Sequence, residues 1–137
     1  TGMDAEGVVL LRDAITGEEF TMRPRVVVNA SGPWTDLTNA ALGEPSQFMG
    51  GTKGSHIVVD HPALLAACNG REIFFEFTDG RIVLIYPLKG RVLIGTTDIA
   101  HDMAEPIRCT EEEVDYFLEV VRYVFPSIPV DRSHIVF

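Results

Sequence analysis

The stretch REIFFEFTDGRIVLIYPLKGRVLIG, residues 71–95, decides the fold class. Its runs at 71–77 and 81–86 are rich in β-branched and aromatic residues, and the turn 78–80 between them ends in Asp-Gly. Two such runs joined by a short Asp-Gly turn predict a β-hairpin. Residues 91–95 predict the next strand, so we expect an antiparallel sheet here.

The residues on either side of this stretch predict a further strand and a helix. Residues 54–60 predict another strand. Thr110 and Glu113 have the capping-box spacing that starts a helix, and Pro126 ends it. The apolar residues that recur between them at helical spacing are Val114, Phe117, Leu118, Val121 and Phe125. We therefore expect an α+β fold, largely an antiparallel sheet with one flanking helix.

The first part of the chain has a different pattern. Runs at 8–11 and 18–22 flank a Gly-containing turn and predict a hairpin. The continuous β-branched run at 25–29, RVVVN, is typical of a central strand that is buried on both faces. This order of elements predicts a unit distinct from the sheet that follows.

A short helix closes this first unit. Residues 35–42 predict the helix, and Gly43 is expected to be its left-handed cap. Residues 44–52 are rich in Pro, Ser and Gly, which is typical of a loop between subregions. We therefore expect a boundary after residue 43, with units at 1–43 and 44–137.

Composition and charge describe a folded domain. A chain of 137 residues matches one domain or part of a larger one, and 46% hydrophobic residues exclude disorder for most of it. The chain has 11 Lys and Arg against 20 Asp and Glu, and this net charge of −9 argues against a nucleic-acid partner. The longest apolar run, 63–68, is far shorter than the roughly 18 residues of a spanning helix.

The two cysteines, Cys68 and Cys109, have no CxxC partner, and no secretory signal precedes them. A reduced, cytosolic setting is therefore expected, with both thiols as inert packing residues. No metal-ligand spacing is found in the sequence, so no metal site is expected.

The two ends suggest an internal segment of a longer protein. The chain begins without an initiator Met, residues 8–11 read as a strand already in progress, and 133–137 read as a strand that has just begun. A functional site is then expected to be shared with residues outside this chain. Unpaired edges at 25–29 would also allow strand exchange between copies, so a homo-oligomer stays open.

Residues 26–34, VVVNASGPW, form the first candidate site. Ligands of open α/β sheets lie beyond the carboxyl ends of strands, and small side chains let a ribose or phosphate approach the backbone. Ala30, Ser31 and Gly32, followed by Trp34, are placed for such an approach. The alternative is a tight strand-to-helix connection that binds nothing.

Residues 52–58, TKGSHIV, form the second candidate site. On a strand, Lys53 and Ser55 share one face while Gly54 and His56 share the other. Lys53 can then point to an anion, and His56 can take a proton near neutral pH. Gly54 weakens a strand unless another group approaches closely. The alternative is a solvated Lys53 and a half-buried, structural His56.

Residues 93–98, LIGTTD, place the hydroxyls of Thr96 and Thr97 at a strand end. This arrangement suits a polar ligand, or turn hydrogen bonds alone. The acidic run at 111–115 is explained by the helix dipole and receives no catalytic role. Three further histidines are interpreted as structural or exposed: His61, His101 and His134.

Taken in order, six segments resemble the middle of the FAD-dependent glycerol-3-phosphate dehydrogenase family. These segments are VVVNASGPWTD, GTKGSHIVVD, DGRIVLIYPL, VLIGTTD, TEEEVDYFLEVV and FPSIPVDRSHIVF. Several motifs in the right order are more specific than any single one. The resemblance implies that 1–43 supplies a hairpin, the last strand and a short helix of an FAD-binding domain, and that 44–137 belongs to a substrate-binding domain.

The resemblance also implies roles for individual residues. His56 would stand beside the flavin ring and the substrate carbinol as the catalytic base or proton relay. The residues that would lie against FAD are Ala30, Ser31, Gly32 and Trp34. The residues that would support His56 or line the substrate side are Lys53, Ser55, Thr96 and Thr97. Ser31 stands where the family commonly has Thr, and both carry a small hydroxyl.

Two family features are absent from this sequence. It has no GxGxxG dinucleotide fingerprint, which the family carries near its N-terminus. It also ends before the segment where the family places an active-site arginine. Independent catalysis by this chain is therefore not expected, and the main phosphate-binding arginines are expected outside it.

The implied reaction is oxidation of sn-glycerol 3-phosphate to dihydroxyacetone phosphate. The C2 hydroxyl loses its proton to a base while the C2 hydride passes to flavin N5. Electrons would then pass to a quinone, which implies a cytoplasmic, peripheral location on the inner face of a membrane. Two alternatives remain: another FAD-dependent enzyme of the superfamily that acts on a small hydroxy or amino acid, and a non-catalytic binding domain.

Overall fold

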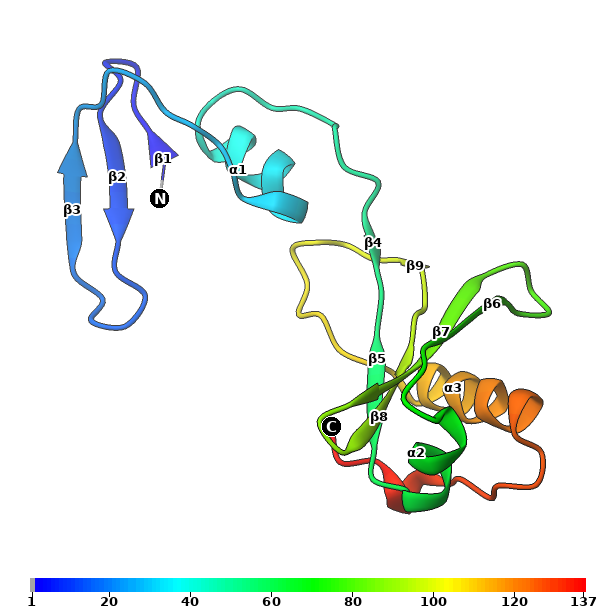
Figure 1. Cartoon of the computed structure of the whole chain (residues 1–137). Helices are drawn as coiled ribbons and strands as arrows, with labels where there is room; N and C mark the ends of the chain where they lie inside the picture. Colours follow the sequence, from blue (N-terminus) through cyan, green and yellow to red (C-terminus); the bar gives the residue numbers. More distant parts are fainter. Residues whose placement is uncertain (1) are drawn as a thin grey trace. The chain divides into compact units, whose positions relative to one another are not determined.

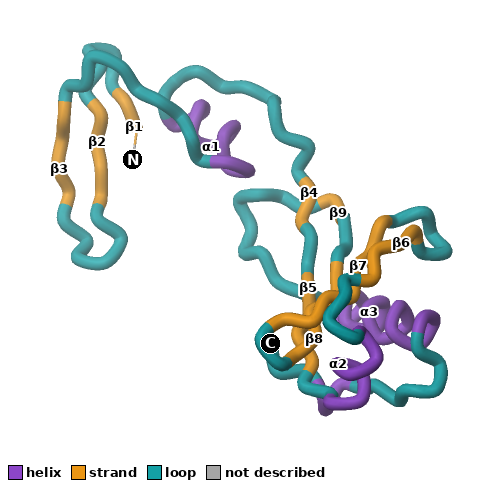
Figure 2. Tube along the Cα trace, viewed as in Figure 1, coloured by secondary structure: helices purple, strands orange, loops and turns teal. Residues whose placement is uncertain are grey.

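The computed structural model describes residues 2–137 and divides the chain into two compact units (Figure 1). The first unit is Thr1–Gly51 together with Asp102–Glu105, and the second is Thr52–His101 together with Pro106–Phe137. The break at Gly51 lies further along the chain than the boundary that the Gly-rich and Pro-rich loop suggested. Each unit has its own antiparallel sheet, as Figure 2 shows in orange.

The second unit is built on a four-stranded antiparallel sheet, which confirms the expected fold class. Its strands, in the order in which they pair, are β5 (His56–Val59), β8 (Arg91–Gly95), β7 (Ile82–Leu88) and β6 (Ile73–Glu76). The predicted turn at 78–80 joins β6 to β7, with Gly80 at φ +83°. The Asp-Gly signal located this hairpin because only a residue that tolerates positive φ fits there.

One predicted strand is interrupted. Residues 54–60 form no continuous strand: β4 (Thr52–Lys53) pairs with β9 (Ile99–Ala100), and β5 begins only at His56. The cause is a close approach at Gly54, where a Cβ atom would lie 2.7 Å from the carbonyl oxygen of Thr97. The prediction that another group approaches Gly54 is therefore confirmed.

Two helices contribute to the core of the second unit, α2 (Pro62–Cys68) and α3 (Glu111–Val124). The inward side chains alternate along the strands, as a half-buried sheet requires. The buried residues of this core are Ile57, Val59, Leu64, Cys68, Phe77, Val83, Ile85, Val92, Ile94, Phe117, Val120 and Val121. Each such aliphatic or aromatic side chain contributes about 1.5–3 kcal/mol through its burial.

Helix α3 begins and ends as predicted. The Thr110 hydroxyl accepts a hydrogen bond from Glu113 N, and the Glu113 carboxylate accepts one from Thr110 N at 2.8 Å. These two bonds satisfy backbone donors that the first turn leaves without intrahelical partners. The helix ends at Val124, two residues before Pro126.

Helix α2 was not predicted, and it gives His61 a role. The ring Nδ1 of His61 accepts a hydrogen bond from Leu64 N, which caps the helix, and Pro62 occupies a first-turn position. The His61 ring also lies 4.6 Å, centroid to centroid, from that of His134. Both histidines are therefore structural, as the sequence suggested.

The last residues differ from the predicted strand at 133–137. Residues Arg132–His134 form a 3₁₀ turn because the Asp131 carboxylate accepts from Ser133 N at 2.9 Å. Only the residues that follow pair with β5: Val58 N donates to Phe137 O at 2.7 Å, and Val136 N donates to Val58 O at 2.8 Å.

The first unit confirms the hairpin and adds a strand to it. Strands β1 (Gly2–Met3), β2 (Val9–Arg12) and β3 (Glu19–Met22) form an antiparallel sheet. Helix α1 (Thr35–Ala41) follows a 3₁₀ turn at Gly32–Trp34, and Gly43 has the expected left-handed φ of +86°.

The expected central strand at 25–29 is wrong. No residue of this run belongs to a strand, and Val26 and Val28 are 75% and 81% exposed. A run that is apolar on both faces becomes a strand only when other strands pair with it. None of the strands at residues 2–137 does so.

Candidate functional site

His56 lies in a row of side chains that crosses the outer face of the four-stranded sheet. It opposes Gly95 on β8, which opposes Leu84 on β7, which opposes Phe74 on β6. This face carries exposed apolar side chains, with Phe74 at 65% and Tyr86 at 40%. His56 is itself exposed, so its imidazole stands on an open, mostly apolar surface.

Gly95 is the residue that lets the imidazole of His56 lie against the sheet. A Cβ atom at this position would come within 2.6 Å of Nε2 and 2.8 Å of Cγ of His56, and closer still to Cδ2. No side chain fits there without moving the ring. The Gly of the IGTTD motif thus leaves room for the histidine of the KGSHIV motif, although the two lie 39 positions apart along the chain.

A pocket of about 390 Å³ adjoins His56. The residues that line it are Ser55, His56, Ile107, Arg108, Cys109 and Phe137. It brings a titratable imidazole and a guanidinium to one small cavity, which is suitable for a small anionic substrate. Cys109 is exposed there, so the expectation that both cysteines pack in the interior holds only for Cys68.

Lys53, Ser55 and Thr97 are turned into the protein. Lys53 is 9% exposed, and its ammonium forms an ion pair with Glu113 and donates to the carbonyl oxygen of Arg108 at 2.5 Å. Ser55 N donates to Thr97 Oγ1 at 2.9 Å, and that hydroxyl donates to Glu113 Oε1 at 2.6 Å. The expected anion contact of Lys53 has no support in this geometry, since the ammonium is occupied inside the protein.

Glu113 is the residue of the candidate site that sequence reasoning missed. Its side chain is almost fully buried, at 1% exposure. Burial raises the pKa of this carboxyl, but the hydrogen bonds from Lys53, Thr97 and Thr110 outweigh it and lower the pKa to about 2. The signal for its burial was present, because Glu113 lies four residues before Phe117 and so shares its helix face.

Thr96 is intermediate in burial between the buried side chains of Lys53, Ser55 and Thr97 and the exposed side chain of His56. It is half-buried, and its hydroxyl donates to the carbonyl oxygen of Thr97 at 3.0 Å. The absent side chain of Gly54 gives this hydroxyl its space, since a Cβ there would be 2.8 Å from Thr96 Oγ1. Residues 52–55 and 95–97 are therefore in direct backbone contact.

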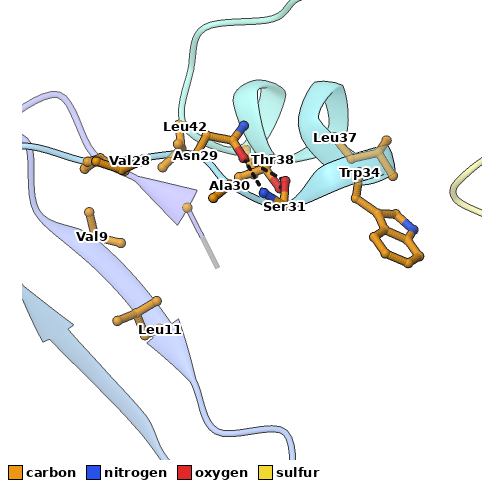
Figure 3. Close-up of a pocket in the computed structure, with 13 residues that line it drawn as sticks. Val9, Leu11, Val28, Asn29, Ala30, Ser31, Trp34, Leu37, Thr38 and Leu42 are labelled. Carbon is orange, nitrogen blue, oxygen red and sulfur yellow. Dashed lines mark hydrogen bonds between the residues drawn. The ribbon is translucent and has the colours of Figure 1, made fainter. Parts of the chain in front are cut away.

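The other candidate group lies in the first unit. Ala30, Ser31 and Trp34 line a pocket of about 480 Å³ whose other walls are mostly apolar (Figure 3). Gly32 follows Ser31 with φ +59°, and a Cβ there would have no other atom within 4 Å. Trp34 is 45% exposed, and its ring N–H donates to the carbonyl oxygen of Met103 at 3.2 Å.

Asn29 holds this turn in place. Its carbonyl oxygen accepts from Ser31 N and from the Ser31 hydroxyl, at 3.1 and 2.7 Å (dashed lines in Figure 3). Its amide donates to Thr35 O at 3.0 Å and to Asn39 Oδ1 at 2.5 Å. The hydroxyl of Ser31 is thus engaged within the unit, while Ala30 and Gly32 present an open, small-residue surface. The predicted site residues therefore form two groups, one in each unit.

No cluster of three potential metal-ligating His, Cys, Asp or Glu side chains occurs within residues 2–137. In the same part of the chain, no helix combines the length and the apolar character that crossing a bilayer requires.

The fold and these motifs define a class of protein. The model of the FAD dependent oxidoreductase family matches residues 1–136, so the chain belongs to that family. This match confirms the flavin-dependent family that the sequence motifs indicated.

Comparisons with individual proteins are more specific than the family match. The chain is 33% identical over 127 residues to the aerobic glycerol-3-phosphate dehydrogenase of Staphylococcus aureus strain USA300, with 90% of this chain and 22% of the relative covered. The same protein of strain COL matches equally. A solved glycerol-3-phosphate dehydrogenase of Bacillus halodurans, complexed with FAD, matches with a TM-score of 0.72 and 31% identity over 93% of this chain and 26% of that chain. The chain thus spans about a quarter or less of the length of these relatives.

Proposed function

We propose that this chain is a segment of an FAD-dependent enzyme that oxidises sn-glycerol 3-phosphate to dihydroxyacetone phosphate and passes the electrons to a quinone. The observation that carries the proposal is the imidazole of His56, which lies over Gly95 on an open sheet face beside a pocket with Arg108. The similarity to glycerol-3-phosphate dehydrogenases over nine-tenths of the chain supports the choice of substrate.

The turn at 30–32 suits close approach by the uncharged parts of FAD. Ala30 and Gly32 are small and exposed, and the space above Gly32 is open. Trp34 adds an exposed aromatic surface on the same turn. None of these side chains carries a charge, so the turn can adjoin the ring or sugar portion of the cofactor but offers no cation to its diphosphate. On this basis the first unit is part of an FAD-binding domain and the second is part of a substrate-binding domain.

In the proposed reaction, His56 takes the proton of the C2 hydroxyl as the alcohol becomes a ketone. FAD, when bound, would be the oxidant that receives the hydride of the same carbon. His56 lies at the surface of the sheet, where its ring can reach a substrate, and the absence of a side chain at Gly95 leaves the ring its space against the sheet. Thr96 is only half-buried, and its hydroxyl oxygen, which donates to the carbonyl oxygen of Thr97, can still accept a hydrogen bond from the substrate.

Lys53, Ser55 and Thr97 act in this proposal through the backbone that carries His56. Their polar groups bind one another and Glu113, which leaves the substrate phosphate to other cations. Arg108 lines the same pocket as His56 and offers a cation there. The quinone acceptor and the peripheral position at the inner membrane face belong to the same proposal and rest on the resemblance alone. Assembly into a homo-oligomer was expected from an unpaired strand edge at 25–29, which forms no strand here, and it stays a prediction.

Anaerobic addition of glycerol 3-phosphate to the full-length protein that carries this chain tests the proposal. We expect the absorbance of oxidised flavin to bleach with glycerol 3-phosphate, and not with glycerol or with amino acids. His56→Ala should slow this bleaching by about a hundredfold, within the usual range for a general base. Bound flavin that stays oxidised would contradict the choice of substrate, and a purified protein without flavin would contradict the cofactor.

A further inference from the structure

We propose that Glu113 is a positioning residue for His56: from the first turn of α3, its carboxylate anchors the two backbone segments that hold the imidazole in place. The inference rests on the proposed function in so far as it treats His56 as the catalytic base. It adds a residue that the sequence had assigned only to the capping box and the helix dipole.

The connection from Glu113 to His56 is short. Glu113 Oε1 accepts from Thr97 Oγ1 at 2.6 Å, and Thr97 Oγ1 accepts from the backbone N–H of Ser55 at 2.9 Å. Ser55 immediately precedes His56. Two hydrogen bonds therefore connect the buried carboxylate to the backbone N–H of the residue that precedes His56.

The second carboxylate oxygen holds the other side of this segment. Glu113 Oε2 pairs with the ammonium of Lys53, two residues before Ser55, and accepts from Thr110 N at 2.8 Å. Lys53 also donates to the carbonyl oxygen of Arg108 at 2.5 Å. One carboxylate thus holds both ends of 53–55 and ties them to the start of α3.

Strand pairing adjoins this segment but does not include Gly54 or Ser55, since β5 pairs with β8 only from His56 onward. Strand β4 contributes a ladder of two residue pairs with β9, and Gly54 has no side chain to pack. The contact at Gly54 is a close approach of backbone to backbone, which sets a minimum distance but no direction. Hydrogen bonds donated to the buried carboxylate supply the direction, because charge-assisted bonds are short and geometrically selective.

Stability alone is a weak explanation for this arrangement. A buried ion pair is often no more stabilising than apolar residues of the same volume, because desolvation offsets the attraction. A buried ion pair does, however, define the relative positions of the groups that it joins. Its partners here are Lys53 and Thr97, which lie in the two segments that adjoin His56 and Gly95.

The first test uses the 137-residue chain and needs no cofactor. Glu113→Gln is compared with Glu112→Gln, which makes the same charge change at the adjacent, exposed position. NMR should show a nuclear Overhauser contact between the His56 ring and the Gly95 α-protons in the wild type and in Glu112→Gln. In Glu113→Gln we expect this contact to weaken severalfold and hydrogen exchange at the Ser55 amide to rise at least tenfold.

The second test uses the full-length flavoprotein. With Glu113→Gln we expect kcat per bound flavin to fall at least tenfold while KM changes less than threefold. A merely structural role would lower the amount of folded, flavin-loaded protein but leave kcat per bound flavin unchanged. Thr97→Val removes the intermediate hydroxyl while Lys53 and Glu113 remain paired, so it should reproduce the loss even if Glu113→Gln folds poorly. Thr97→Ser keeps the hydroxyl and should restore most of kcat.

The results separate the two proposals. An unchanged His56 to Gly95 contact in Glu113→Gln, or an unchanged kcat per bound flavin, overturns the positioning role. If glycerol 3-phosphate fails to reduce the wild-type flavin, the proposed function fails instead. The NMR comparison would still support or overturn the anchoring of His56 by Glu113.

Discussion

Replacing Gly95 by Ala should separate activity from stability. The backbone at Gly95 does not have the positive φ that disfavours other residues, so the substitution acts through the new methyl group. That methyl would lie 2.6 Å from Nε2 of His56, whereas atoms in normal contact are about 3.5–4.0 Å apart. The imidazole must therefore move by about 1 Å or rotate away from the sheet.

The two consequences of this movement differ in size. His56 is exposed, so its ring can leave at the cost of an altered rotamer, about 0.5–1.5 kcal/mol. Replacing Gly by Ala also reduces the conformational freedom of the unfolded chain. This stabilises the folded state by about 0.4–1 kcal/mol and so offsets part of the rotamer cost. The net change in unfolding free energy is then close to zero. A misplacement of about 1 Å in a reacting group costs about a hundredfold in rate.

The assay combines thermal unfolding of the chain with kcat/KM for glycerol 3-phosphate in the full-length flavoprotein. Gly50→Ala is the matched control, because a Cβ at Gly50 meets no atom within 4 Å and its φ is not positive. We expect Gly50→Ala to keep both properties and Gly95→Ala to keep only stability. If Gly95→Ala retains kcat/KM within threefold, the packing of His56 on Gly95 is irrelevant to catalysis and the reasoning fails.

Three further outcomes follow from the second unit. The pKa of Glu113 falls from 4.5 to about 2 on folding, so its stabilisation is fully present above pH 4.5 and is lost as the pH falls toward 2. This amounts to about 3 kcal/mol, so the loss of unfolding free energy between pH 6 and pH 2, measured in urea, should be about 3 kcal/mol larger in the wild type than in Glu113→Gln, which keeps the other carboxyls of lowered pKa. His61→Ala should cost about 1 kcal/mol of unfolding free energy in a urea titration, through loss of the α2 cap, with an unchanged value contradicting that role. Phe117→Ala, at a fully buried position, should cost about 3–5 kcal/mol in the same titration, and a cost below 1 kcal/mol would contradict the core described above.

Local signals predicted the parts of the fold that are held by local interactions. The hairpin of β6 and β7 follows from an Asp-Gly turn between alternating runs, and α3 follows from its capping box and its helical spacing. Helix α2 has seven residues, too few for intrinsic propensity to decide, and it depends on the burial of Leu64 and Cys68. The run at 25–29 failed for the opposite reason, because its pattern describes a buried strand but carries no information about which strands would pair with it.

The same distinction explains the outcome at the candidate site. Gly54 was correctly predicted to have a close neighbour, since glycine in a strand has a local cost that needs a cause. The partner of Lys53 was not predictable from spacing, because Glu113 lies 60 residues away and in a helix. Its position on the same helix face as Phe117 was the available signal, and the capping box offered a sufficient explanation for a glutamate there.

The register of one segment determines both the buried ion pair and the exposed imidazole. Along 52–59 the side chains alternate strictly, so that Lys53 and Ser55 are buried while His56 points outward. A slip by one residue would turn His56 inward and Lys53 outward. It would also leave Glu113 buried without its counter-charge, which costs about 3–5 kcal/mol. The Lys53–Glu113 pair therefore disfavours the slipped register, in which His56 would no longer lie on the open face of the sheet. This effect does not require the pair itself to add net stability.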